Sequence, residues 1–174
     1  LNYFPEPITA HGDVHFDTIP EAWVQDEANF LFYGFPDFSI PAMSSYTTPW
    51  QFLPVLDGAE IFAITGHTHQ WGTNVEVQYA EGLDDSSADA IYPGEVPFKW
   101  DEAPVVTYDP PLAFDGGSGL RYRCSWDNTS NKKADFGESA NKEMCFLWAY
   151  YYPSQGYKLC MNLGSYSDFI GQDT

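Results

Sequence analysis

Short runs in which apolar and polar residues alternate dominate the chain, and helical patterns are scarce. Residues 73–79 alternate cleanly, so Val75, Val77 and Tyr79 share one face, as in a strand that buries one side. Residues 120–126 alternate apolar or aromatic with polar positions in the same way. Both segments therefore predict β-strands with one face turned toward a core.

The remaining runs are shorter or more apolar. Residues 146–152 form an almost unbroken aromatic run, which predicts a strand buried on both faces. Residues 60–65 and 105–108 also predict strands, and residues 20–28 are the best helical candidate because proline and acidic residues stand near their start. Clusters of Gly, Pro, Asp and Asn separate the runs. The pattern predicts an all-β fold, an antiparallel β-sandwich of jelly-roll type.

The N-terminal region differs from the rest in composition. The first 50 residues are richer in proline and aromatic residues and contain fewer clear strands. We expect residues 1–50 to form an irregular arm packed on the sandwich and residues 51–174 to form the sandwich domain. A chain of 174 residues has the size of a single domain.

Charge excludes several classes of partner. The chain has 25 acidic and 7 basic residues, for a net charge of −18. Nucleic acid and anionic lipid both attract clustered Lys and Arg, so neither is an expected partner. No segment provides the run of about 20 apolar residues that a membrane helix needs. Aromatic residues make up 18% of the chain, so much of its contact area is ring surface.

The sharpest chemical motif is Gly66-His67-Thr68-His69. Residues i and i+2 of a strand point to the same face, so His67 and His69 can present two imidazoles to one ion. A second glycine, Gly72, follows the motif, and we expect the two flanking glycines to let the chain bend around a site. The alternative is a pair of histidines with no metal.

Met144 is the candidate third ligand. It stands beside a cysteine at the start of the aromatic run, where a methionine can also serve only to fill the core. Soft sulfur selects Cu(I), and imidazole suits both oxidation states of copper. Together with His67 and His69, this thioether points to copper.

Two further histidines, His11 and His15, alternate with Asp13 and Asp17. In an extended chain these four side chains share a face, which defines a second candidate metal site with harder ligands. The competing interpretation is a half-buried strand with its polar side in water.

Four motifs, in order and spacing, resemble a known family. They are Gly-His-Thr-His at 66–69, Tyr-Arg-Cys-Ser-Trp-Asp-Asn-Thr-Ser at 122–130, Glu-Met-Cys-Phe at 143–146 and Tyr-Tyr-Tyr-Pro at 150–153. Over roughly residues 61–157 the chain resembles the C-terminal catalytic domain of the copper type II, ascorbate-dependent monooxygenases. That family includes peptidylglycine α-hydroxylating monooxygenase and dopamine β-monooxygenase, and its fold is a jelly-roll-like sandwich.

The resemblance implies a ligand set and a reaction. His67, His69 and Met144 would bind one copper ion, with no catalytic residue beyond these ligands. The implied reaction is O2-dependent hydroxylation of a C–H bond, with ascorbate or a similar external reductant as electron donor. The resemblance also pairs Cys124 with Cys145 in a disulfide. Trp71, Phe146 and Trp148 then form a candidate pocket beside the metal.

The chain departs from the family pattern at several positions. Where peptide-hydroxylating members carry an arginine for the substrate carboxylate, this chain has Thr65, and their tyrosine four residues after the methionine is Trp148 here. Peptide amidation is therefore not supported. The three-histidine site of the family's electron-transfer domain has no match in this sequence, so we expect a partner domain or chain to supply electrons. Cys160 is the cysteine left over.

Three functions remain open at this stage. The first is the oxygen-activating half of a copper monooxygenase, the second is a non-catalytic protein for copper capture, storage or delivery, and the third is a ring-rich sandwich that binds a ligand. The disulfide indicates an extracytoplasmic location, secreted or periplasmic. The start of the chain at Leu1 indicates a processed or trimmed protein. The sequence defines no particular small-molecule or peptide substrate.

Overall fold

A computed structural model describes residues 9, 11–114 and 116–162. This part of the chain contains twelve β-strands, one short 3-10 turn and no α-helix, so the all-β prediction is confirmed. The helical candidate at residues 20–28 is reduced to η1 (Glu21–Trp23), which has no side-chain cap and buries none of its residues. So short a segment forms too few hydrogen bonds to offset the cost of starting a helix unless it also packs against the rest of the protein. No helix in the described segments is long and apolar enough to cross a membrane.

Ten of the strands belong to two large sheets. In the first sheet the spatial order is β12 (Lys158–Met161), β1 (Asn29–Gly34), β11 (Phe146–Tyr152), β5 (Glu60–His67) and β8 (Val105–Ala113). The second sheet has the order β3 (Ser44–Thr47), β9 (Gly119–Asn128), β6 (Gly72–Ala80) and β7 (Asp89–Tyr92), with β4 (Gln51–Pro54) also on β9. The short strands β2 (Ser39–Ile40) and β10 (Ala134–Asp135) pair with each other. Every pairing is antiparallel except that of β1 with β12.

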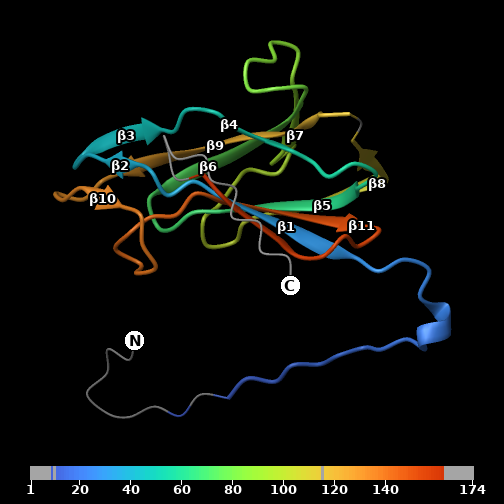
Figure 1. The fold of residues 1–174 in the computed structure, drawn as a ribbon. Helices are drawn as coiled ribbons and strands as arrows, with labels where there is room; N and C mark the ends of the chain where they lie inside the picture. The colour runs from blue at the N-terminus through green and yellow to red at the C-terminus, as the bar shows by residue number, and fades with distance from the viewer. Residues whose placement is uncertain (1–8, 10, 115, 163–174) are drawn as a thin grey trace.

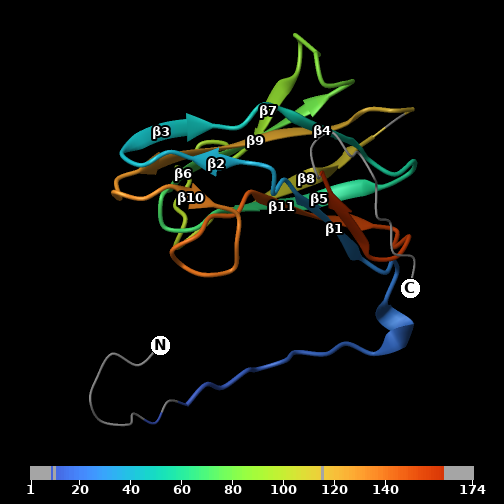
Figure 2. The ribbon, with the colours of Figure 1, turned by 60° about the vertical axis from the view of Figure 1, so that its left-hand side comes forward.

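The two sheets form facing layers around one core (Figures 1 and 2). Val75 and Val77 of β6 are fully buried, as the alternation predicts, and Tyr79 packs against the core at its edge. From the opposite sheet, Gly66 of β5 lies close to the side chain of Val75. The sandwich layers follow from these contacts, and the jelly-roll topology stays a prediction.

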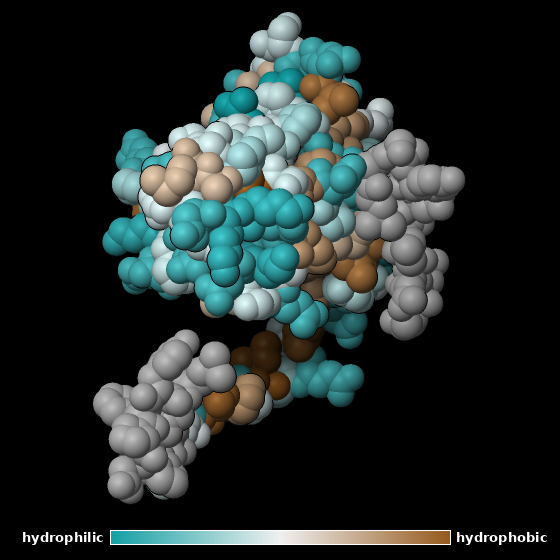
Figure 3. Space-filling model, turned by 90° about the vertical axis from the view of Figure 1, so that its left-hand side faces the viewer, coloured by the Kyte–Doolittle hydropathy of each residue, from teal (hydrophilic) through white to brown (hydrophobic). Residues whose placement is uncertain are grey.

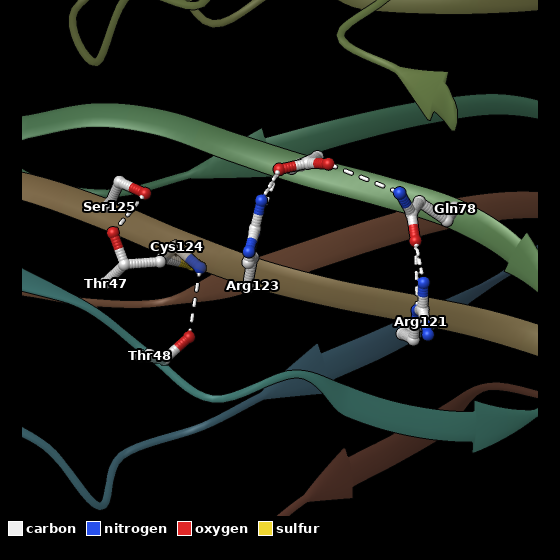
Figure 4. Close-up of polar contacts among 8 residues, drawn as sticks. Thr47, Thr48, Gln78, Arg121, Arg123, Cys124 and Ser125 are labelled. Carbon is white, nitrogen blue, oxygen red and sulfur yellow. Dashed lines mark hydrogen bonds and ion pairs between the residues drawn. The ribbon is translucent and has the colours of Figure 1, made fainter. Parts of the chain in front are cut away.

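The outer face of the second sheet is polar. Arg123 of β9 forms an ion pair with Glu76 of β6 at 2.7 Å, and Arg121 donates to the side chain of Gln78 (Figure 4). Both guanidinium groups lie over the ring of Trp50: that of Arg121 is 4.6 Å from the ring centroid and that of Arg123 is 4.2 Å from it. On this face, therefore, the charged groups of Arg121, Arg123 and Glu76 all interact with neighbouring side chains.

The outer face of the first sheet is aromatic and partly exposed. The prediction that residues 146–152 form a strand buried on both faces is wrong, because only the inner face is covered by the second sheet. Leu147, Ala149 and Tyr151 are fully buried, whereas Tyr150 on the other face is 37% exposed. The outer rings of β1 and β11 cover one another instead, and Phe32 meets Trp148 edge-on at 5.1 Å.

The N-terminal region enters the sheets earlier than the sequence predicts. Within the expected arm of residues 1–50, β1 pairs with β11 and β12 in the first sheet, and β3 pairs with β9 in the second. Aromatic residues on both faces of β1 hide its alternation in the sequence. The irregular part that the structure describes is residues 11–28, apart from η1, and its side chains are exposed rather than packed on the sandwich (Figure 3).

Tyr122 of β9 provides a test of the core. Its hydroxyl is buried without a hydrogen-bond partner among the described residues, and burial raises the pKa of this phenol. An unfolded chain hydrates that hydroxyl, so leaving it unpaired costs about 1–3 kcal/mol. We expect Tyr122→Phe to raise the free energy of unfolding in urea by about 1 kcal/mol.

The matched control for this prediction is Tyr151→Phe. The Tyr151 hydroxyl donates to the Gly156 carbonyl at 2.6 Å and accepts from the Gln155 N–H at 3.0 Å. Its removal should lower the free energy of unfolding. A loss of stability in Tyr122→Phe of the same size would show that the Tyr122 hydroxyl has a partner.

Candidate metal centre

His67 and His69 lie where the chain crosses from one sheet to the other. His67 is the last residue of β5 in the first sheet, and Gly72 opens β6 in the second. The two imidazole centroids are 5.2 Å apart, with their planes nearly perpendicular at 84°. Both side chains are half-buried. The structure thus brings together the two rings that the sequence motif singles out.

Two hydrogen bonds orient His69. Its Nδ1 lies 2.9 Å from the carbonyl oxygen of Lys142, and its backbone N–H donates to the Glu143 carboxylate at 2.7 Å. A carbonyl oxygen only accepts, so Nδ1 must carry the proton in this contact. The lone pair then resides on Nε2, which is the usual arrangement for a histidine that binds a metal.

The His67 ring is held in an aromatic corner of the sheet. It meets the Trp148 ring edge-on at 5.6 Å and stacks on Phe146 at 6.3 Å. Burial, and next the nearby His69, lower the pKa of His67. A lowered pKa keeps the imidazole neutral at neutral pH, which is the form that binds metal.

Met144 lies at the same end of the first sheet. Phe146, two residues further on, is the register partner of His67, and Met144 itself is half-buried. Its neighbour Cys145 is bonded to Cys124, so the backbone beside Met144 is tied in place. The role of Met144 as a ligand stays a prediction.

The Cys124–Cys145 disulfide is present, as the family resemblance implies. Cys124 belongs to β9 in the second sheet and Cys145 immediately precedes β11 in the first, so the bond joins the two layers. Cys160 of β12 is the free cysteine and is half-buried. Burial raises the pKa of its thiol, which makes Cys160 a poor nucleophile.

A surface hollow of about 370 Å³ opens at the two histidines. Its other walls come from segments that the sequence does not connect with the motif, at residues 100, 101, 138 and 140. The lining residues are His67, Thr68, His69, Gln70, Trp100, Asp101, Glu138 and Ala140.

The three rings expected to form a pocket are not among the lining residues of this hollow. Phe146 is buried in a ring cluster with Phe32 and Trp148, and Trp71 packs against the core. Trp100 is the aromatic residue at the hollow instead. No pattern in the sequence marks it, because its loop meets the histidines only in the folded chain.

The second candidate metal site gains no support in geometry. His11 and His15 lie in the exposed N-terminal segment. Within residues 9, 11–114 and 116–162, no three His, Cys, Asp or Glu side chains group together in a way that could hold a metal ion. A set of two histidines and one methionine contains only two side chains of those types, so this finding does not bear on the His67 site.

The donors at the His67 site fit copper better than a hard cation. Burial lowers the pKa of His67, Nδ1 of His69 faces the Lys142 carbonyl, and the predicted third donor, Met144, carries a thioether. Imidazole with thioether is a donor set that copper accepts in both oxidation states, whereas Mg²⁺ and Ca²⁺ prefer oxygen.

Comparison with known proteins agrees with this chemistry. Residues 40–171, most of the chain, match the family model described as copper type II ascorbate-dependent monooxygenase, C-terminal domain. A search of curated proteins finds no match to the chain.

Proposed function

The chain belongs to the copper type II ascorbate-dependent monooxygenase family as a C-terminal domain, and from this membership we propose that it is the oxygen-activating half of such an enzyme. In this proposal His67, His69 and Met144 bind one copper ion. The observation that carries it is the pair of imidazoles 5.2 Å apart at the mouth of a hollow, with Nε2 of His69 left free.

Bound copper would supply the one-electron chemistry by which O2 and a reductant hydroxylate a C–H bond. The protein's own residues supply orientation and access. The Lys142 carbonyl holds the tautomer of His69, the rings of Phe146 and Trp148 confine His67, and the hollow admits a substrate beside both histidines. A thioether ligand at Met144 would favour the reduced ion, Cu(I).

The setting of the reaction is part of the same proposal. A buried disulfide joins the two sheets and persists in oxidising compartments, so we place the protein outside the cytoplasm. Electrons come from ascorbate or a similar reductant, through a partner domain or chain. Peptide amidation is not part of the proposal, because Thr65 and Trp148 replace the arginine and the tyrosine of the peptide-hydroxylating members.

Copper titration of four proteins tests the ligand set. We expect His67→Ala, His69→Ala and Met144→Ala each to weaken copper binding more than tenfold relative to wild type, with Met144→Ala acting mainly on Cu(I). Affinity is measured by competition with a chromogenic chelator under reducing and oxidising conditions.

The matched controls are His11→Ala and His15→Ala, which remove exposed histidines from the N-terminal segment. They should bind copper as wild type does, and weakened binding in either would instead support the second metal site. Unchanged affinity in all three ligand variants would remove the copper proposal and leave a ring-rich binding module. Copper binding without oxygen consumption, when ascorbate and a partner domain are supplied, would indicate a copper carrier.

A further inference from the structure

A buried carboxylate lies directly behind the two candidate copper-binding segments. Glu143 is 0% exposed, although it stands only one residue before Met144. Its Oε2 accepts from the backbone N–H of His69 at 2.7 Å and from the indole N–H of Trp126 at 2.8 Å. Its Oε1 accepts from the backbone N–H of Trp71 at 2.9 Å. The side chain therefore has three N–H donors.

Burial of a carboxylate is costly unless its charge is satisfied. None of the three donors is a cation, so backbone and indole dipoles hold the charge of Glu143. The nearest lysine in sequence, Lys142, directs its ammonium group toward Asp135 at 4.0 Å. Hydrogen bonds to an ionised acceptor are shorter and roughly twice as strong as neutral ones, which offsets the cost of burial.

The backbone of Glu143 is fixed as well as its side chain. Its N–H donates to the Asp135 carbonyl and its carbonyl accepts from the Gly137 N–H, both at 3.1 Å. Two residues further on, Cys145 is bonded to β9. Backbone hydrogen bonds and the nearby disulfide thus fix the position of the carboxylate. The turn that contains His69 is in turn held by its hydrogen bonds to that carboxylate.

From this geometry we infer that Glu143 is a positioning residue for the metal centre. It ties the turn of His69 and Trp71 to the segment that leads into Met144, two segments 74 positions apart in the chain. The inference rests on the proposed copper function and concerns a residue that is not itself a ligand. Loss of a residue that orients metal ligands typically weakens metal binding 10–100-fold.

The variant Glu143→Gln tests the inference with almost no change in volume. A glutamine offers one oxygen, and its amide NH2 group must then face an N–H donor. We expect Cu(I) affinity to fall roughly 10–100-fold, measured by competition with a chromogenic chelator. X-ray absorption of the Cu(I)-loaded variant should show reduced copper–sulfur scattering. The control Glu95→Gln removes the same charge from an exposed loop and should leave both readouts unchanged.

Amide hydrogen exchange of the metal-free protein provides a second readout. The backbone N–H groups of His69 and Trp71 should be protected in wild type and should exchange at least tenfold faster in Glu143→Gln. Unprotected amides in wild type, or Cu(I) affinity of Glu143→Gln within twofold of wild type, would overturn the inference. Wild type that binds no copper would overturn the proposed function, and the exchange rates would then decide the role of Glu143 alone.

A further variant covers the case in which Glu143→Gln does not fold. Trp126→Phe keeps a ring in the core and removes one of the three donors to the carboxylate. We expect it to weaken Cu(I) binding several-fold and to speed exchange at His69. Wild-type behaviour in both measurements would contradict the inference.

Discussion

The double substitution Cys124→Ala/Cys145→Ala is expected to lower the free energy of unfolding by about 3 kcal/mol. The disulfide closes a loop with a sequence separation of 21, and without it the unfolded chain regains the entropy that the closed loop removes. Both cysteines are 0% exposed and their bond joins the two sheets, so the folded state also loses an interlayer contact. Urea denaturation followed by Trp fluorescence measures the change.

Cys160→Ala is the control for this prediction, because Cys160 is a free thiol in β12. It should retain most of the wild-type stability, and wild type treated with a strong reductant should behave like the double variant. A double variant as stable as wild type would show that the two layers need no covalent link.

Gly66→Ala is expected to lower the free energy of unfolding by about 3 kcal/mol. A Cβ at Gly66 would lie 2.7 Å from both Cβ and Cγ1 of Val75 in the opposite sheet, closer than real side chains approach. The backbone N–H of Gly66 also donates to the Tyr92 hydroxyl at 3.0 Å, which limits how far β5 can move. Urea or thermal denaturation measures the loss.

The added variant Val75→Ala distinguishes overpacking from other causes. In Gly66→Ala/Val75→Ala the smaller side chain makes room, so the double variant should lose less than the two single losses added together. Gly82→Ala, where a Cβ meets nothing within 4 Å, should leave stability nearly unchanged. Strictly additive losses would show that the contact with Val75 is not the cause.

Gly66 also shows where sequence reasoning ends. Glycines on both sides of the His67–His69 motif suggest a chain that bends around a site. In the structure, Gly66 lies inside β5, and its missing side chain makes room for Val75. The sequence displays the residue but not the strand that faces it. Alternation within one segment is local and predicts β6 and β9 well, whereas contact between layers is not local.

The candidate site divides in the same way. Spacing alone predicts that His67 and His69 can face one ion, and the family resemblance implies the Cys124–Cys145 bond. The walls of the hollow at Trp100 and Glu138, by contrast, come from loops far from the motif in sequence. The sequence hints at a role for Glu143 only in that an acidic residue stands shortly before the apolar strand β11. Its hydrogen-bond donors at His69 and Trp126 are revealed only by the fold.

In the proposed copper site, the pairing of β5 with β11 would couple metal occupancy to completion of the fold. Under the proposed ligand set, His69 and Met144 would meet only after the segments of His69 and Glu143, 74 positions apart, have closed on each other. An unfolded chain would keep the local His67–His69 pair but would lack the complete site with three ligands. Copper would then bind the native state more tightly than the unfolded chain. At a free copper concentration of about 100 times Kd, this linkage would add up to about 2.7 kcal/mol to stability, less any contribution from copper bound to the unfolded chain. Copper loading would therefore stabilise the completed sandwich relative to partly folded forms of the chain.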